Sequence, residues 1–313
     1  MSLYPKAIEA VLAGIPIGYN SNIYFVDSAN GDDSNLGDRW QKPLATIAAA
    51  FAKCVANQND VVVLTNVASN TLSAALDWNK NYTHLVGIGA PTMVAQRSRI
   101  FQLSTLTGAS PLLTISASGC VFKNFYIFQG VDDATSLINV SVTGGRNYFE
   151  NVHFAGGGHA TQAINGGASL KLDGAEENTF VDCTIGVDTV AAATGMVNLL
   201  MDGEAHRNIF KGCHFSLYAG NAGAAWVEVA DATGIDRYNI FWDCIFTNTV
   251  TGTALTSGFV IPAGMGAPRR LVLKDCVSLG AAKWDANDRD VLFGNMDAVT
   301  GADLSGALVE MVT

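Results

Sequence analysis

Apolar and polar residues alternate in short runs along most of this chain, and one such run returns at a fixed spacing. The octapeptide Asn178-Thr-Phe-Val-Asp-Cys-Thr-Ile185 is followed by close copies that begin at Asn208 and Asn239. Weaker or shorter copies begin at Asn147, Leu271 and Cys120. The four asparagines, at 147, 178, 208 and 239, follow one another by 31, 30 and 31 residues. A fixed period of about 20 to 50 residues is typical of stacked structural repeats.

The unit 196–225 indicates the structure of one repeat. Its alternation predicts three short strands, at 196–201, 208–211 and 213–217. A polar turn, a tight corner at Gly212 and a returning loop connect them. Three strands in about 30 residues form one coil of a parallel β-helix, whose neighbouring strands lie about 4.8 Å apart. We therefore predict an all-β fold, a single-domain right-handed parallel β-helix over 22–313 with about eight or nine coils.

Cysteines mark the inward face of the third strand. The alternation places Cys213 and Phe215 on the same face. One cysteine per repeat occupies this position, in a column made of Cys183, Cys213, Cys244 and Cys276. An aligned inward column predicts buried free thiols that act as small hydrophobic side chains. The chain has no Cys-x2-Cys spacing of the kind found in zinc sites, so we predict no metal and no cofactor.

Two polar columns accompany the repeat. The first lies where the second strand begins and consists of Asn147, Asn178, Asn208 and Asn239. The second lies at the corner between the second and third strands and consists of Asn124, Asn151, Asp182, Gly212, Asp243 and Asp275. Small polar side chains satisfy turn backbone and bond along a stack. We interpret both columns as structural ladders, with a catalytic pair of corner carboxylates as the alternative.

The segment 22–66 precedes the repeats and differs from them. Asn22-Ile-Tyr-Phe-Val-Asp27 predicts a strand, a turn-rich loop follows, and a capping helix is predicted at about 43–56. This strand, loop and helix resemble the N-terminal segment of pectate-lyase-like right-handed β-helix proteins. The resemblance implies the fold without a single function, because sugar-cleaving enzymes, phage tailspikes and other virion proteins share it. The helix is expected to cover the open end of the solenoid.

Two N-terminal features allow competing interpretations. The loop Asp27–Asn35 offers hard oxygen donors that suit Ca²⁺, but its spacing does not match an EF-hand, so we favour a hydrogen-bonded turn. Residues 1–21 are expected to form a separate N-terminal arm. Within it, residues 1–18 combine a helical pattern that begins at Tyr4 with an extended stretch from Gly14. We predict that this segment either packs on the side of the β-helix or docks on a partner.

Composition excludes several partners. The 313 residues are 49% hydrophobic and 15% charged, with a formal net charge of −10. This acidic balance argues against a nucleic acid or an anionic membrane as partner. No apolar run approaches the ~18 residues of a membrane span. The N-terminus also lacks the basic start and apolar run of a secretion signal, so we expect the protein to stay in the cytoplasm or to leave it within an assembly.

The best catalytic cluster lies on the first turns of successive repeats. If the chain is an enzyme, the candidates are Asp202, Glu204, Asp231 and Asp236, with Asp173, Glu176, Glu177, His206, Arg207 and Arg237 nearby. Glycosidases require two carboxyl groups about 5 to 9.5 Å apart, and stacked acids reach such distances by accident. The polygalacturonase motifs Asn-Thr-Asp, Gly-His-Gly and Arg-Ile-Lys are absent. We therefore interpret the cluster as a solvated charged edge and predict no catalytic residue. His153 and His214 share an outward position two coils apart, too far for one metal.

The loops after the third strands are nearly free of charge. Their small and apolar residues include Ala191, Ala192, Ala193, Tyr218, Ala222, Val250 and Leu255. A repeated uncharged edge favours burial against another chain. We therefore predict a homo-oligomer, and a trimer in particular, because tailspike-like β-helices commonly form trimers.

Two classes of function remain. The first is a structural virion protein of a bacteriophage, most simply a head decoration (cement) protein that forms a trimer on the capsid and is assembled in the host cytoplasm. Residues 1–18 are then the segment expected to contact a capsid or other virion protein. The alternative is a polysaccharide-binding or polysaccharide-cleaving β-helix, such as a tailspike depolymerase, glycosidase or lyase. The missing catalytic motifs and the uncharged loop edge favour the first class.

Overall fold

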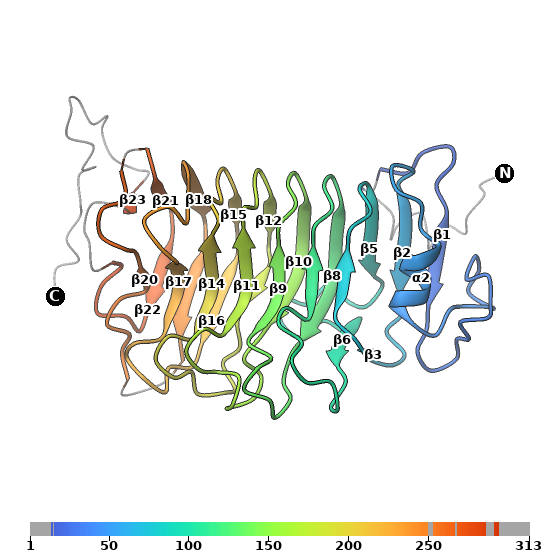
Figure 1. Ribbon diagram of the computed structural model, residues 1–313, viewed down its shortest axis with the longest axis horizontal. Coiled ribbons are helices and arrows are strands. Elements are labelled where there is room, and N and C mark those ends of the chain that lie inside the picture. Colours follow the sequence, from blue (N-terminus) through green and yellow to red (C-terminus); the bar gives the residue numbers. More distant parts are fainter. Residues whose placement is uncertain (1–13, 15, 250–252, 267, 286–290, 294–313) are drawn as a thin grey trace.

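The chain winds into a right-handed parallel β-helix (Figure 1). The computed structural model describes residues 14, 16–249, 253–266 and 268–285, together with the backbone of 291–293. Each strand pairs in parallel with its equivalents on neighbouring coils, as β11 does with β9 and β14. The predicted fold is therefore confirmed. No helix in the described part of the chain is long and apolar enough to cross a bilayer.

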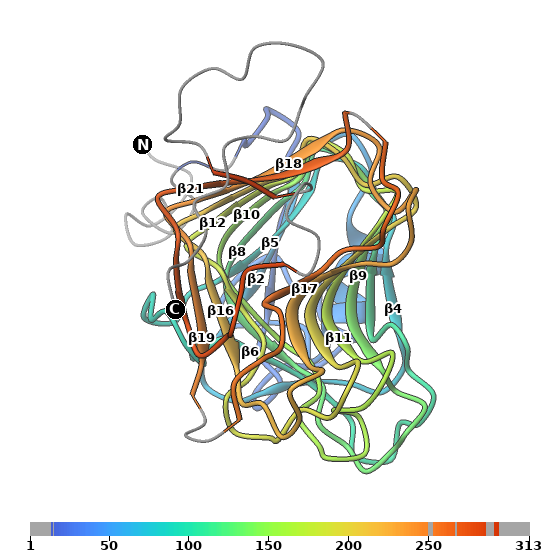
Figure 2. The same cartoon turned by 90° about the vertical axis from the view of Figure 1, so that its left-hand side faces the viewer.

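Two sheets form the walls of the β-helix, which Figure 2 shows along its axis. The larger sheet has 16 strands. Its main run contains β1 (Ile23–Val26), β2 (Asp60–Leu64), β5 (Thr83–Gly87), β8 (Val121–Phe128), β10 (Tyr148–Ala155), β12 (Thr179–Val181), β15 (Ile209–Lys211), β18 (Tyr238–Trp242), β21 (Arg270–Lys274) and β23 (Val291–Phe293). The third strands of the coils extend it beyond the corner: β3 (Asn70–Leu72), β6 (Arg99–Gln102), β13 (Thr184–Ile185), β16 (His214–Leu217), β19 (Ile245–Asn248) and β22 (Val277–Leu279).

The second sheet contains the first strand of each coil. Its seven strands are β4 (Leu76–Trp78), β7 (Leu113–Ile115), β9 (Ile138–Val142), β11 (Ala168–Asp173), β14 (Val197–Asp202), β17 (Ala225–Val229) and β20 (Phe259–Val260). Seven coils of the described chain thus have a strand in both sheets, fewer than the eight or nine predicted. At the N-terminal end, a helix rather than a strand connects β1 to β2.

That helix, α2 (Ile47–Lys53), covers the N-terminal end of the core (Figure 1). It is shorter than the predicted 43–56, because the Thr46 hydroxyl caps its first turn by accepting the Ala49 N–H at 3.1 Å. At its other end the chain turns extended at Cys54, and Lys80 Nζ donates to the carbonyl of Cys54 at 2.7 Å. Phe51 stacks on the buried Trp78 with ring centroids 4.2 Å apart, so the helix closes the solenoid with an aromatic contact.

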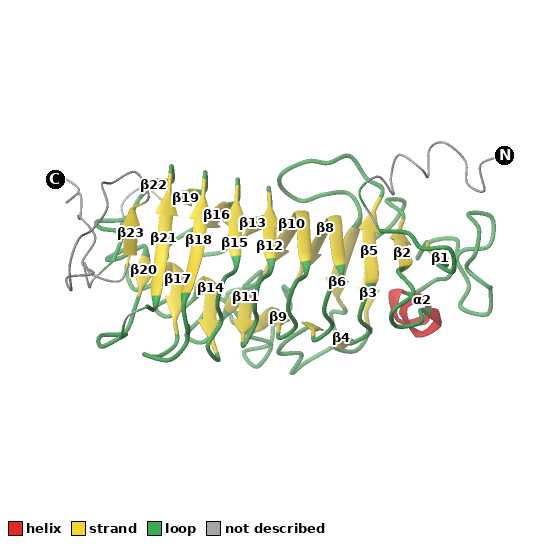
Figure 3. Cartoon of the chain, turned by 90° about the horizontal axis from the view of Figure 1, so that it is seen from above, coloured by secondary structure: helices red, strands yellow, loops and turns green. Residues whose placement is uncertain are grey.

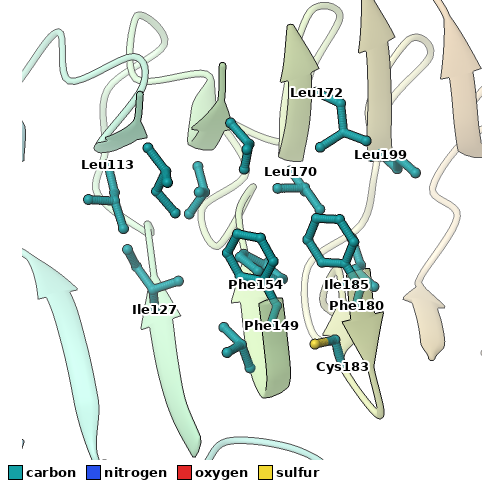
Figure 4. Packing of buried hydrophobic residues seen from close by; sticks show 14 of the residues in the cluster. Leu113, Ile127, Phe149, Phe154, Leu170, Leu172, Phe180, Cys183, Ile185 and Leu199 are labelled. Atoms are coloured by element: carbon teal, nitrogen blue, oxygen red, sulfur yellow. The ribbon is translucent and has the colours of Figure 1, made fainter. Parts of the chain in front are cut away.

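Stacked side chains fill the interior (Figure 4). Phe180 lies between Phe149 and Phe210, with ring centroids 4.4 and 4.5 Å away and nearly parallel planes. Leu170 and Leu172 of the opposite sheet face this stack. The thiols of Cys183, Cys213, Cys244 and Cys276 form the next column; all are free, and the first three are fully buried. Burial raises the pKa of Cys213 well above its ordinary value, so this thiol stays protonated.

The asparagine column forms a continuous hydrogen-bonded ladder inside the turn. The side-chain Oδ1 of Asn178, Asn208 and Asn239 accepts the backbone N–H of the preceding asparagine at 2.9, 3.0 and 3.1 Å, respectively. Each Nδ2 also donates to a backbone carbonyl of the previous coil, as Asn208 does to Ala175. These side chains are buried, so they satisfy backbone groups that water cannot reach.

The corner column adopts a left-handed backbone. The φ angles of Asn124, Asn151, Asp182, Gly212, Asp243 and Asp275 are 60°, 50°, 50°, 64°, 53° and 54°. Asn, Asp and Gly tolerate this conformation better than other residues, which explains why only these types occupy the corner. The Asp182 and Asp243 carboxylates thus belong to residues that the turn geometry itself selects.

Candidate functional site

One long loop interrupts the regular coils on the outer face of the larger sheet. We call residues 88–98, which connect β5 to β6, the strap. It arches from β5 toward β10 across the outside of the β-helix (Figure 3). Its Met93 carbonyl accepts a 2.7 Å hydrogen bond from the Thr184 hydroxyl of β13. The strap therefore connects its own coil with the third coil beyond it.

Buried polar contacts hold the middle of the strap. Gln96 is fully buried, and its Nε2 donates to the carbonyl and to the side-chain oxygen of Asn151, both at 3.0 Å. The Ala95 N–H donates to Nδ1 of His153 at 3.1 Å, so this ring nitrogen is unprotonated. Nε2 of His153 then donates to the Gly186 carbonyl at 2.8 Å. Burial lowers the pKa of His153 to about 4.

His153 thus differs from the sequence-based expectation. It lies on the outward side of its strand, in register with Thr184 and His214, as predicted. It is nevertheless only 4% exposed, because the strap covers it. His214 is separate: its Nε2 lies 2.8 Å from the Thr247 hydroxyl. The two histidines therefore serve different local contacts.

A pocket opens beside the strap. Its volume is about 200 Å³, and it lies between the first strap residues and the corner of β8 and β10. Val86, Ile88 and Pro91 line one side, and Lys123, Glu150 and Asn151 line the other. Lys123 Nζ lies 2.8 Å from a Glu150 carboxylate oxygen, and the Tyr148 hydroxyl donates to the other oxygen at 3.2 Å. Burial, together with the Glu150 carboxylate, raises the pKa of Tyr148 to about 12. The pocket thus combines an apolar wall with a balanced charge pair.

The floor of the pocket is rigid. Asn151 Nδ2 donates to Asn124 Oδ1 at 2.8 Å, and Asn124 Nδ2 donates to the carbonyls of Gly87 and Gly89 at 2.9 and 2.7 Å. A Cβ at Gly87 would lie 2.0 Å from the Asn124 carbonyl oxygen, so glycine is required where the strap leaves the sheet. These bonds connect the strap to the corner column.

The predicted acidic cluster lies on a different edge, and its members are paired. Lys171 Nζ bridges Asp173 and Asp202 at 3.0 and 2.9 Å. Glu176 and Glu177 both pair with Arg146, and Glu177 also pairs with Arg207. His206 Nε2 lies 3.4 Å from Glu176. These contacts link neighbouring coils along the surface.

The remaining candidate acids serve local turns or lie in solvent. Asp236 pairs with the adjacent Arg237 at 3.2 Å. The Asp231 carboxylate accepts the N–H and the hydroxyl of Thr233, both at 2.7 Å, and these bonds lower its pKa. Glu204 is exposed at a left-handed turn position. Asp202, Glu204, Asp231 and Asp236 thus lie along a solvated edge, and none of them lines the pocket beside the strap.

The predicted interface residues divide into two groups. Ala191 is exposed, and Ala193, Tyr218 and Ala222 are half-buried. Ala192 and Leu255 are 2% and 0% exposed, because each forms a parallel bridge to the next coil, with Ala219 and Ala281. These two residues belong to the core of the chain and cannot provide contact surface, which corrects that part of the prediction. Val250 lies outside the described residues.

The N-terminal hypotheses have different outcomes. In the loop Asp27–Asn35, Asp27 accepts the backbone N–H groups of Ala29 and Asn30, while Asp33 accepts those of Ala45 and Thr46. These carboxylates support the loop and the helix cap. No group of three or more His, Cys, Asp or Glu side chains in the described chain is arranged to hold a metal. The expected docking segment, residues 1–18, lies almost entirely outside the described residues.

Sequence reasoning missed the pocket, although one signal was present. Residues 67–109 fit the repeat poorly, and the strap lies within them. Insertions into a solenoid repeat commonly map to loops on a binding face. The irregular stretch, with Gly87, Gly89 and Pro91 clustered at its centre, was therefore the place to look.

Comparison with known proteins identifies the fold. No protein-family model matches the sequence, and a search of curated proteins finds no similar sequence. A solved rhamnogalacturonan lyase is 16% identical with a TM-score of 0.62, over 87% of this chain and 73% of that one. A pectin methylesterase in complex with a hexasaccharide is 15% identical with a TM-score of 0.56, over 92% of each chain. The pectate lyase Pel9A is 13% identical with a TM-score of 0.54, over 90% of this chain and 80% of that one. The chain therefore has the pectate-lyase-like right-handed parallel β-helix fold that the segment 22–66 predicts.

Proposed function

We propose that the protein is a non-catalytic structural component of a bacteriophage particle, a head decoration protein that forms a trimer on the capsid. One observation carries the proposal: large apolar side chains are exposed together on the outer face of the C-terminal coils. Ile245, Val277 and Leu279 are 44%, 52% and 58% exposed. Ile245 and Val277 are aligned across β19 and β22, and Leu279 follows on the same face.

Such a surface favours contact with another protein. Contiguous exposed apolar residues are uncommon on monomeric proteins and mark interaction sites. In a closed symmetric oligomer every chain uses the same surface, so one exposed face can provide all the contacts. Burial of Ala192 and Leu255 removes two residues from the uncharged loop edge, so we place the contact on the face of β19 and β22 instead.

The charged edge supports a role without catalysis. A general acid and base need carboxyl groups with separate, tuned environments near one bound substrate. Here Asp202 is held by Lys171, and Asp236 by Arg237, on an exposed surface. The Lys171–Asp202 pair connects neighbouring coils, whereas Asp236 pairs with its neighbour in the sequence.

Light scattering on the purified chain tests the oligomer. We expect the mass of three chains for the wild type, and a lower mass for Val277→Lys and Leu279→Lys. Val67→Lys is the matched control, because Val67 is 63% exposed near the N-terminal end. A monomeric wild type, or a trimer in all variants, contradicts the proposed contact. An antibody against the chain should also label the heads of purified phage particles from the source culture; label confined to tails contradicts head decoration.

A second candidate function is glycan binding or cleavage. It is favoured by the pocket beside the strap and by structural neighbours named for action on polysaccharides, one of them bound to a hexasaccharide. Incubation of the purified chain with acidic and capsular polysaccharides distinguishes the two roles. We expect no cleavage. Cleavage that disappears in Asp202→Asn or Glu204→Gln, with unchanged melting, would make the charged edge an active site and overturn the structural proposal.

A further inference from the structure

We propose that the pocket beside the strap binds one pyranose unit of a neutral glycan. The proposal rests on the second candidate function, because it names the binding site and the class of sugar. The site is separate from the charged edge and from the apolar face of β19 and β22. It is therefore compatible with a particle protein that also attaches to a glycan.

The two sides of the pocket match the apolar face and the polar rim of a sugar ring. A pyranose has a face of C–H groups and a rim of hydroxyls. Ile88 and Pro91 offer apolar contacts for the face, and Lys123 and Glu150 offer a donor and an acceptor for the rim. The volume of about 200 Å³ is below the ~300–1,000 Å³ of sites for drug-sized ligands. A single ring is therefore the appropriate size.

The charges favour a neutral sugar. Lys123 and Glu150 neutralise each other at 2.8 Å, and both are about one-third exposed, so they remain within reach of a ligand. A uronic acid would bring its carboxylate close to Glu150, and an amino sugar would bring its ammonium group close to Lys123. A hydroxyl, in contrast, can donate to one group and accept from the other. Vicinal hydroxyls thus fit the pair without breaking its charge balance.

The rest of the site is preorganised. The amides of Asn124 and Asn151 are already engaged in fixing the corner and the first strap residues. Gln96, His153 and Thr184 hold the strap at three further points. Preorganised groups bind with less loss of conformational entropy than groups that must first be ordered.

The strap is longer than the connection between two strands of a coil requires. Two residues, Asp182 and Cys183, are enough to connect β12 to β13 at the equivalent corner. The strap takes 11 residues, 88–98, for the connection from β5 to β6. Ordering one residue costs about 1–2 kcal/mol in backbone entropy, so a long ordered connection without a structural need points to a binding role.

An array of neutral and acidic oligosaccharides, probed with the full-length chain, tests the proposal. We expect binding to neutral glycans. The strongest hit is then titrated calorimetrically against Glu150→Gln and Lys123→Gln, each expected to weaken binding about tenfold or more, since each loses a charge-assisted hydrogen bond. Lys211→Gln is the matched control, because Lys211 aligns with Glu150 two coils away and outside the pocket. It should bind like the wild type.

Hydrogen exchange provides a readout that does not depend on the variants folding. The neutral glycan should slow exchange at 88–98 and leave 200–217 unchanged. Wild-type protein that binds no glycan overturns both the pocket and the glycan function. Glycan binding that is equal in Glu150→Gln, Lys123→Gln and wild type, without protection of the strap, overturns the pocket alone. Preference for acidic glycans overturns the assignment of a neutral sugar.

Discussion

The regular coils at 138–248 and the strap at 88–98 are built on different principles. In the coils, equivalent residues serve the same purpose again and again: Asn178 and Asn208 each accept a backbone N–H from the coil before. In the strap, Gln96 and Ala95 make contacts that are not repeated in the other coils of the described chain. The repeat therefore provides stability, whereas the strap, which departs from the repeat, creates a pocket.

The two regions also differ in the sequence separation of their contacts. Ladder partners such as Asn178 and Asn208 are 30 residues apart, one period of the repeat. Gln96 and Asn151 are 55 residues apart, and Met93 and Thr184 are 91 apart. These latter separations reach across several coils. A substitution in the coils should therefore affect global unfolding, while a change in the strap should act mainly on the pocket.

The largest effect is expected from Phe180→Ala in the regular coils. Removing this ring leaves a cavity between Phe149 and Phe210 and should lower the free energy of unfolding by about 4 kcal/mol. Urea unfolding followed by fluorescence measures the change. Val181→Ala, a half-buried neighbour on the outer face, is the control and should cost less than about 1 kcal/mol. Equal losses for the two variants would contradict the assignment of Phe180 to the stack.

The second-largest effect is expected from Asn208→Ala in the asparagine ladder. The variant leaves the Asn178 N–H buried without a partner and removes one of the two donors to the Ala175 carbonyl, which keeps the His206 N–H, so we expect a loss of about 3 kcal/mol in the same urea experiment. Asn221→Ala is the control, since Asn221 is exposed and accepts one turn N–H from Gly223. A loss below about 1 kcal/mol for Asn208→Ala would show that water replaces the ladder.

The two buried histidines should make stability depend on pH in the strap and in the first coils. Burial lowers the pKa of both His84 and His153 from 6.5 to about 4. Well above pH 6.5 both histidines are neutral in the folded and in the unfolded protein. As the pH falls toward 4, they bind protons in the unfolded protein but stay neutral in the folded protein. Each histidine should therefore cost about 2 kcal/mol of stability by pH 5.

Urea unfolding at pH 7.5 and at pH 5 measures that loss. In His153→Gln the difference between the two pH values should shrink by about 2 kcal/mol. Asn221→Ala is the control and should keep the full difference, because the Asn221 side chain is exposed and does not titrate. An unchanged difference in His153→Gln would mean that the strap opens freely to water, and it would weaken the contrast between coils and strap.

The smallest effect is expected at the corner. Asp243 has a φ of 53°, so Asp243→Val should cost about 1–2 kcal/mol, while Asp243→Gly should stay within about 0.5 kcal/mol of the wild type. Thermal melting of the two variants side by side measures the difference. If Gly and Val are equally destabilising, the carboxylate itself, and not the backbone conformation, determines the residue at this position.

The sequence by itself determined the coil, its strands and its columns. Alternation separates inward Phe215 from outward His214, and the period of about 30 residues stacks Asn178 on Asn208, because both depend only on local geometry repeated at one spacing. The same reasoning placed Asp243 at the corner after the second strand, and the structure adds that its backbone there is left-handed.

Only the tertiary structure decided which outward residues stay exposed. Ala192 and Leu255 turned out to be core residues, and His153 turned out to be covered, because strands and loops from other coils pack against them. The helix also proved shorter, since Thr46 is held as its cap by Asp33. The pocket beside the strap has the same origin: Ile88 and Glu150, which are far apart in the sequence, line the same pocket, and the period of the repeat does not predict this arrangement.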